Sequence, residues 1–355
     1  MRRKKGLERG IGLTFLALFL VVLPLVSSDT QGAEKVIKPI DLKFSHFVPP
    51  HHFLQADGFM PWAKAVEQRS GGRVKITFYP GETLSKGKDN FDSAVTGVAD
   101  IAWVSIAYTP GLFPLTEIFF APRMANISAE TCTHIYHELY EKFPQIRAEY
   151  SKVKVLWLHI GSSAGLLSAK KPIRRLEDVE KMVIRAVGPN GETAKALGAT
   201  PVSMTVPDVY MAMERGSVDA ALVPIEALIG FKLHEVTKYL TLGFQAGYGP
   251  YLTAMNLKVW NSLPPDIQRI MDEESAKAAF LNARGWDKSE KDAIELMKSK
   301  GAVINLSEEE AERWRVKLNP LWDKWVADRE AKKLPGKQVC DEALRLFKKY
   351  EQAPK

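Results

Sequence analysis

The pattern of apolar and polar residues from about residue 40 alternates between stretches typical of strands and stretches typical of helices. Short apolar runs at 41–47, 73–79 and 100–106 are predicted to be strands. Residues 59–70 and 89–96 place apolar side chains at helical spacing, and Gly97 follows the second of these helices. Regular alternation of the two element types predicts an α/β fold with mainly parallel sheets.

The same alternation continues through the rest of the chain. Ser128, Asn190 and Thr205 are each placed to cap a helix, and Ser307 with Glu310 matches a capping box. Further strands are predicted over 153–160, 183–187 and 219–223, and helices over 128–143, 176–180, 192–197, 205–215, 264–300 and 341–350. Segments 93–104 and 211–223 share one pattern, in which a helix ends at Gly and an Asp opens an apolar strand. This similarity favours two lobes of similar α/β construction.

The N-terminus has the layout of a secretory signal peptide. Five basic residues between Arg2 and Arg9 precede an apolar run at 11–26, and small residues follow up to Ala33. We predict that residues 1–33 are cleaved after Ala33, with cleavage after Ser28 as the alternative. A retained membrane anchor is the competing interpretation, but the run is short for a membrane span.

Composition and charge narrow the function further. The chain has 355 residues, is 46% hydrophobic and 26% charged, and carries a formal net charge of +7. Residues 1–33 hold five basic and two acidic residues, so the mature chain of 322 residues would carry only +4. Because no basic cluster interleaves with aromatic residues, we expect no nucleic-acid partner. Two cysteines, Cys132 and Cys340, exclude a disulfide-dense scaffold, and the sequence leaves open whether they pair.

Arg185 is the most informative single residue. It lies among apolar residues at the C-terminal end of the predicted strand 183–187. Open α/β sheets bind ligands outside that end of their strands. The planar guanidinium of a buried arginine suits a carboxylate. From the residues alone, a structural ion pair with Glu177 or Asp178 is the simpler interpretation.

Two other motifs raise alternative functions. Gly161–Gly165 matches G-x-S-x-G, and a serine hydrolase would use Ser163 with Asp219 and His234. A nucleophile elbow must turn into a helix, however, and residues 166–173 are predicted to be extended. His46, His51 and His52 lie close together, but no carboxylate or cysteine at ligand spacing accompanies them. We therefore expect neither a metal site nor a cofactor.

Several longer segments together resemble the solute-binding proteins of TRAP transporters (the DctP type). They are FSHFVPPHH, WAKAVEQRSGGRVKITFYPGETL, SAVTGVADIAWV, GLFPLTEIFFAP, LEDVEKMVIRAVG and ALGATPVSMTVPDVYMAMERGSVDAALVP. Their order and spacing extend the resemblance over nearly the whole mature chain. The resemblance implies a two-lobe periplasmic binding protein fold with a cleft between the lobes and a long bridging helix.

The resemblance also implies where the lobes lie. We expect lobe I to comprise residues 36–160 and to include 249–290, which return through the bridging helix. Lobe II would comprise 161–248, and helices of 291–355 would pack on the lobes. Such a protein captures an organic acid in the periplasm, delivers it to a membrane permease and performs no catalysis. The serine hydrolase and a periplasmic sensor partner are the alternatives.

The resemblance implies a set of ligand-binding residues as well. Arg185 matches the position that meets the ligand carboxylate, and Gly165 and Val223 replace polar residues found in the sialic-acid branch of the family. An apolar pocket would favour an aromatic or branched monocarboxylate. The full predicted set is Arg185, Trp103, Phe47, His46, Val206, Val223, Gln245 and Tyr248.

Overall fold

The computed structural model describes residues 39–121, 127–244 and 246–352. The predicted signal peptide and Gln245 lie outside these ranges. Within them, no helix combines the length and the apolar character that crossing a membrane would require.

The strands of the described residues belong to one ten-stranded arrangement. They are β1 (Ile40–Ser45), β2 (Val74–Tyr79), β3 (Ile101–Ser105), β4 (Val153–Ser168), β5 (Val183–Arg185), β6 (Thr200–Val202), β7 (Ala220–Pro224), β8 (Tyr239–Leu242), β9 (Tyr248–Asn256) and β10 (Val303–Asn305). Their order is β2-β1-β3-β9-β4-β7-β5-β6, with β8 beside β4 and β10 beside β8.

Helices cover this sheet. They are α1 (Met60–Arg69), α2 (Asn90–Thr96), α3 (Ala129–Lys142), α4 (Pro144–Glu149), α5 (Pro189–Ala196), α6 (Val206–Glu214), α7 (Ala227–Gly230), α8 (Leu257–Ser262), α9 (Pro265–Ser299), α10 (Glu308–Leu318), α11 (Pro320–Glu330) and α12 (Gly336–Glu351). Shorter 3-10 or π-helical turns are η1 (Leu54–Phe59), η2 (Gly87–Asp89), η3 (Ile106–Tyr108), η4 (Thr116–Phe120), η5 (Leu176–Asp178) and η6 (Leu233–Glu235). The predicted alternation of strands and helices is therefore confirmed.

The expectation of mainly parallel sheets is wrong at the centre of the molecule. β4 pairs with β9 up to Ser163 and with β7 from Ala164 onward, and both pairings are antiparallel. β4 thus passes from one half of the sheet to the other, and β9 passes back beside it. Two adjacent strands that cross in opposite senses must be antiparallel. The outer pairs β1–β2, β1–β3, β5–β6 and β5–β7 are parallel, as predicted.

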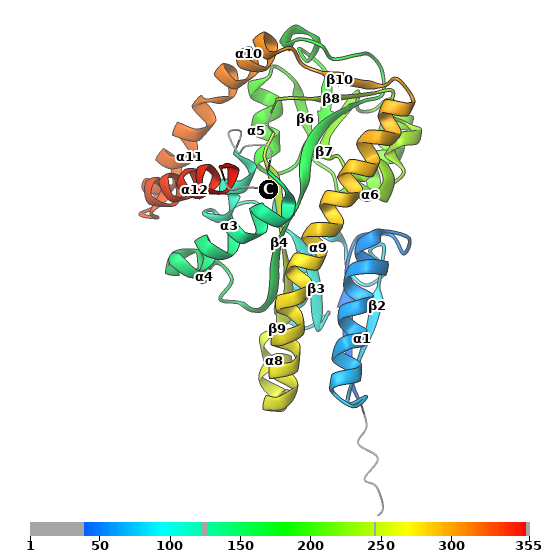
Figure 1. Ribbon diagram of the computed structural model, residues 1–355, viewed down its shortest axis with the longest axis vertical. Coiled ribbons are helices and arrows are strands. Elements are labelled where there is room, and N and C mark those ends of the chain that lie inside the picture. The colour runs from blue at the N-terminus through cyan, green and yellow to red at the C-terminus, as the bar shows by residue number, and fades with distance from the viewer. Residues whose placement is uncertain (1–38, 122–126, 245, 353–355) are drawn as a thin grey trace, which may run out of the picture. The chain divides into compact units, whose positions relative to one another are not determined.

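Helix α9 spans both halves of the sheet. Its first part packs in a hydrophobic cluster with β1, β3 and α1, where Ile267 and Trp286 are buried. Its last part packs with α6, α7 and β8, where Ala293 and Met297 are buried. Figure 1 shows α9 running from α8 toward β8 and β10. The helix therefore bridges the two lobes and extends beyond residue 291.

Helix starts agree with the sequence only in part. The hydroxyls of Ser128 and Ser307 accept hydrogen bonds from the backbone nitrogens of Thr131 (3.0 Å) and Glu310 (3.2 Å). Asn190 is not a cap, because α5 begins at Pro189, which suits the first position of a helix. The Thr205 hydroxyl lies 3.2 Å from an Asp208 carboxylate oxygen and does not cap the backbone of α6.

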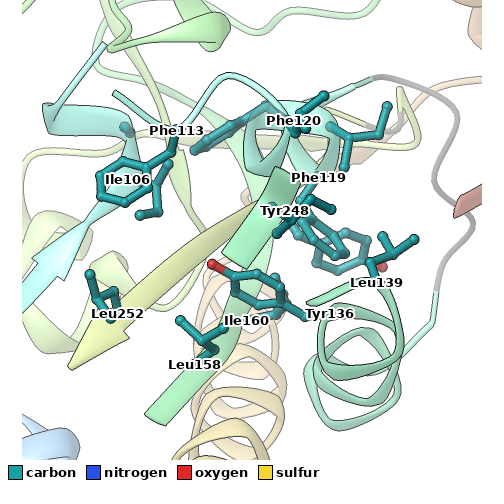
Figure 2. Packing of buried hydrophobic residues seen from close by; sticks show 14 of the residues in the cluster. Ile106, Phe113, Phe119, Phe120, Tyr136, Leu139, Leu158, Ile160, Tyr248 and Leu252 are labelled. Carbon is teal, nitrogen blue, oxygen red and sulfur yellow. The ribbon is translucent and has the colours of Figure 1, made fainter. Parts of the chain in front are cut away.

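The largest hydrophobic cluster joins α3 and α12 to the first half of the sheet and to η4. Figure 2 shows Phe119, Tyr136, Leu139 and Tyr248 together in this cluster. Cys132 and Cys340 both lie in it, and no disulfide joins them.

Candidate functional site

A small cavity of about 20 Å³ lies between the two halves of the sheet. The first half contributes Phe47, Val48, Trp103 and Tyr108. The second half contributes Val206, Val223, Pro224, Glu226, Ala227 and Phe231, and Tyr251 and Trp286 complete the wall. Other cavities, of about 300, 550 and 520 Å³, are larger. We take the small one as the candidate site because four predicted ligand-binding residues meet there.

Stacked aromatic rings form one side of this cavity. The rings of Trp103 and Tyr251 lie nearly parallel with centroids 4.6 Å apart, and Trp286 stacks on Tyr251 at 5.3 Å. Phe47 packs against Trp103 at 4.6 Å and against Tyr108 at 5.2 Å. Such a wall offers flat apolar surface to an aromatic or branched ligand.

Arg185 lies directly behind this wall, at the C-terminal end of β5. Its side chain is 1% exposed. Nε and Nη2 donate to the Met204 carbonyl at 3.0 and 2.8 Å, and Nη1 lies 3.5 Å from the Leu222 carbonyl. Within residues 39–121, 127–244 and 246–352, no carboxylate forms an ion pair with it.

The two acids that the sequence offered as partners of Arg185 are engaged elsewhere. Glu177 pairs with Arg313. One Asp178 oxygen accepts hydrogen bonds from the backbone nitrogens of Arg174 and Arg175, at 2.9 and 3.2 Å. The interpretation of Arg185 as part of a structural ion pair is therefore wrong.

Burial dominates the electrostatics of Arg185. It lowers the pKa of the guanidinium from its ordinary value, and the hydroxyls of Tyr108 and Tyr251 oppose that shift. A buried cation whose partners are all neutral is unfavourable, because no negative charge compensates for the hydration that it has lost. An anionic group that reached Arg185 would be held by charge-assisted hydrogen bonds.

Tyr108 connects the two halves of the sheet at the cavity. It lies in η3, and its hydroxyl accepts a hydrogen bond from the backbone nitrogen of Val206, the first residue of α6, at 2.9 Å. The same hydroxyl lies beside Arg185. A ligand carboxylate bound by Arg185 would therefore lie where both halves meet.

The structure brings together Phe47, Trp103, Val206 and Val223, with Arg185 behind them. His46 lies in a neighbouring aromatic core, where its ring packs edge-on against Phe44 and Nε2 is 2.5 Å from Oε1 of Gln55. Burial is the main cause that lowers the pKa of His46 to about 4.

Two further predicted residues lie away from the cavity or outside the description. The Tyr248 hydroxyl donates to the Ile127 carbonyl at 2.7 Å and accepts from the Ile127 backbone nitrogen at 3.1 Å. Figure 2 places Tyr248 among Phe119 and Tyr136. Gln245 is not among the described residues.

The predicted set lacks five charged or aromatic residues at the cavity: Tyr108, Glu226, Phe231, Tyr251 and Trp286. Glu226 follows the C-terminal end of β7, so the argument that singled out Arg185 could have found it. Phe231 directly follows α7 and Trp286 lies in α9, and only the tertiary fold brings them to the site.

The geometry contradicts the serine hydrolase. Ser163 lies inside the long strand β4 and not at a turn into a helix, and its hydroxyl donates to Glu290. Asp219 pairs with Lys170, and Nδ1 of His234 lies 2.6 Å from the Leu228 carbonyl. The three residues of the proposed triad thus have separate partners.

The histidines of residues 46–52 have different surroundings. In the described ranges, no group of three or more His, Cys, Asp or Glu side chains could hold an ion. His51 is exposed, whereas His52 is buried and contacts Glu226.

Comparisons with known proteins identify the family of this chain. Residues 44–328 match the family described as bacterial extracellular solute-binding protein, family 7 (DctP). Because the match covers most of the chain, the protein belongs to this family. It is thus a two-lobe solute-binding protein of the TRAP transporter class, a non-enzymatic family of periplasmic or extracellular proteins.

Three relatives illustrate the range of ligands. The C4-dicarboxylate-binding periplasmic protein DctP of Rhodobacter capsulatus is 26% identical over 329 residues, which are 88% of this chain and 91% of the relative. A TRAP solute-binding protein from an unidentified marine microbe, specific for aromatic acids and bound to 3-hydroxybenzoate, is 29% identical. Its TM-score is 0.82, over 89% of this chain and 100% of that chain. A TRAP solute-binding protein from Rhodoferax ferrireducens with benzoate is 25% identical, with a TM-score of 0.82 over 88% and 99% of the two chains.

Proposed function

We propose that this protein captures an aromatic or branched monocarboxylate between its two lobes and delivers it to the membrane permease of a TRAP transporter. The observation that carries the proposal is Arg185, a buried cation behind an aromatic cavity with carbonyl and hydroxyl partners but no carboxylate among the described residues. Relatives that bind benzoate and 3-hydroxybenzoate support an aromatic ligand.

The proposal assigns each contact a role. Arg185 binds the ligand carboxylate, and Phe47, Trp103, Val206 and Val223 surround the apolar part. His46 and Tyr248 have partners away from the cavity, and as ligand contacts they stay predictions from the sequence. Gln245 stays a prediction from the sequence.

We also propose the lobe boundaries and the route of export. Lobe I comprises 36–160 with 249–290, and lobe II comprises 161–248. The change of partner of β4 from β9 to β7 between Ser163 and Ala164 supports that division. Residues 291–355 pack on both lobes, and residues 1–33 direct export to the periplasm before they are removed.

Binding of a carboxylate by Arg185 can be tested with purified protein lacking residues 1–33. Benzoate, mandelate, isovalerate and succinate are titrated by calorimetry. We expect at least one of the three monocarboxylates to bind and Arg185→Gln to weaken its binding at least a hundredfold. The loss of two charge-assisted hydrogen bonds, each of roughly 1.5–3 kcal/mol, accounts for that change.

Arg174→Gln is the matched control, because Arg174 is exposed and does not line the cavity. It should bind as the parent does. Equal affinity of Arg185→Gln and the parent would show that Arg185 does not hold the carboxylate.

A further inference from the structure

A buried carboxylate faces the candidate site. Glu226 lies two residues after the end of β7, is 1% exposed and lines the cavity between the lobes. A glutamate is almost never fully buried unless it is paired. Its partners therefore bear on what the cavity accepts.

His52, from the loop after β1, is the partner of Glu226 across the two lobes. Its Nε2 lies 3.0 Å from Oε1 of Glu226, and both side chains are buried. Nδ1 of His52 accepts a hydrogen bond from the backbone nitrogen of Leu54 at 3.2 Å. Nε2 is therefore the ring nitrogen that faces Glu226, but its contact with Oε1 does not have the geometry of a hydrogen bond, and both atoms are buried without a hydrogen-bond partner in the part of the chain that the structure describes.

A glycine makes room for this pair. A Cβ atom at Gly230 would lie 2.0 Å from Oε1 of Glu226 and 2.7 Å from Nε2 of His52. Any larger residue at position 230 would force the two side chains apart. The absence of a side chain at Gly230 thus lets Glu226 and His52 pack closely beside the cavity.

The carboxylate of Glu226 has an oxygen, Oε1, that is buried without a hydrogen-bond donor among the described residues. Nε2 of His52 lies 3.0 Å from this oxygen without forming a hydrogen bond to it. A buried carboxylate oxygen with no donor is unfavourable. A ligand that brought a hydrogen-bond donor into the cavity would supply the donor that this carboxylate lacks.

Arg185 and Glu226 both act on the same side chain in the cavity wall. Burial is the main cause that raises the pKa of the Tyr251 hydroxyl. The negative charge of Glu226 adds to that shift, and the positive charge of Arg185 opposes it. The two charges therefore lie near one hydroxyl of the cavity wall. A ligand whose carboxylate meets Arg185 extends its apolar part toward Glu226.

We propose that Glu226 determines specificity by accepting a hydrogen bond from a ligand hydroxyl remote from the ligand carboxylate. The site then selects hydroxylated monocarboxylates and rejects dicarboxylates, because a second carboxylate would face Glu226. A neutral hydroxyl suits these apolar walls better than an ammonium group, which is costlier to desolvate. This inference rests on the proposed function, since it assumes that Arg185 binds a carboxylate.

The parent protein alone can decide the ligand preference. Its affinities are measured for benzoate, the three monohydroxybenzoates and the three benzene dicarboxylates. We expect one monohydroxybenzoate to bind about tenfold more tightly than benzoate, as for a hydrogen bond to a charged acceptor. We expect every benzene dicarboxylate to bind at least tenfold more weakly than benzoate.

The possible failures are distinguishable. If none of these acids binds, the proposed aromatic ligand is wrong and the inference fails with it. If benzoate binds but no hydroxyl group improves its affinity, or a dicarboxylate binds equally well, only the role of Glu226 is wrong.

The variant Glu226→Gln then tests the residue itself. Its near-identical shape keeps the contact with His52 while it removes the charge. The preference for the hydroxylated ligand should fall to threefold or less, and dicarboxylates should gain affinity relative to benzoate. Glu309→Gln, at an exposed position on α10, is the control and should keep the parent's preferences. Unchanged preferences in a folded Glu226→Gln protein would overturn the proposal, and should this variant not fold, the comparison of ligands on the parent still decides.

Discussion

Arg185 and His46 are both buried, but they contact different kinds of group. Arg185 stays charged and has only neutral partners, so it attracts an anion. His46 is surrounded by Phe44, Phe59 and Phe78, and an uncharged ring suits that core.

The burial of His46 predicts a loss of stability in acid. Its pKa is about 4 in the folded protein, below the ordinary 6.5. Between these values the unfolded chain binds more protons at this site, so the free energy of unfolding rises with pH and falls on acidification. The contribution present above pH 6.5 is up to roughly 3 kcal/mol and is lost as pH falls to about 4.

Denaturant unfolding of the parent and of His46→Gln across pH 4 to 7 measures this contribution. The difference between the two profiles isolates His46 from other titrating groups, such as Glu149, whose pKa burial raises to about 7. The parent should lose more stability than the variant on acidification, and benzoate affinity at pH 7 should stay within about threefold. Parallel profiles would contradict the assignment.

The sequence singled out Arg185, the cation of the candidate site, but not Glu226, the carboxylate that lines its cavity. Arg185 stands out because it is a lone charge in an apolar strand at a strand's C-terminal end. The importance of Glu226 depends on His52, which lies 174 positions earlier in the chain and meets it only through the fold. No pattern of neighbouring residues in the sequence indicates a contact between two positions so far apart.

At the scale of elements, strands and helices with local signals were predictable, including the first half of β4, whereas the second half of β4 and β9 were not. The parallel strands β1, β2 and β5 have apolar runs bounded by breakers. β9 carries Gly249 and Pro250 near its start, which indicate a turn, yet it pairs with β3 and β4 in the middle of the sheet. β4 continues through the G-x-S-x-G motif to Ser168 because its second half pairs with β7 and β8.

Helix α9 is hydrogen-bonded to β4 at the place where β4 passes from one half of the sheet to the other. The hydroxyl and the backbone nitrogen of Ser163 both donate to the Glu290 carboxylate, and the pairing of β4 with β9 shifts register just before Ser163. We expect Ser163→Ala to lower the free energy of unfolding by about 1–2 kcal/mol, because Glu290 loses one of two donors. Calorimetry should show that benzoate binding remains.

Ser163→Ala also tests the serine hydrolase hypothesis directly. A fluorophosphonate probe should label neither the parent nor Ser163→Ala. Labelling that disappears in the variant, together with loss of ester hydrolysis, would show Ser163 to be a nucleophile and contradict the structural role.

At the scale of the whole binding protein, the cavity is too small for the proposed ligand. About 20 Å³ holds roughly one water molecule, and an aromatic acid needs several times that volume. The walls come from both lobes, and Tyr108 and Val206 are hydrogen-bonded across them. Entry of a ligand therefore requires the lobes to separate around β4, β9 and α9.

Spin labels on the two sides of the cleft would detect this motion. Lys86 lies in lobe I, and its pKa is raised mainly by Glu82 and further by Asp208 of lobe II, so the two lobes approach one another there. Lys86→Cys with Asp208→Cys should give a distance distribution that includes longer distances without ligand and becomes shorter and narrower with saturating benzoate. Cys132 and Cys340 are buried, so labelling of the folded protein spares them.

The control is the pair Lys75→Cys with Lys86→Cys, which lies within lobe I. The distance between its two labels should not change when ligand is added. Identical distributions across the cleft with and without bound ligand would mean that the cavity widens by side-chain movement and not by separation of the lobes.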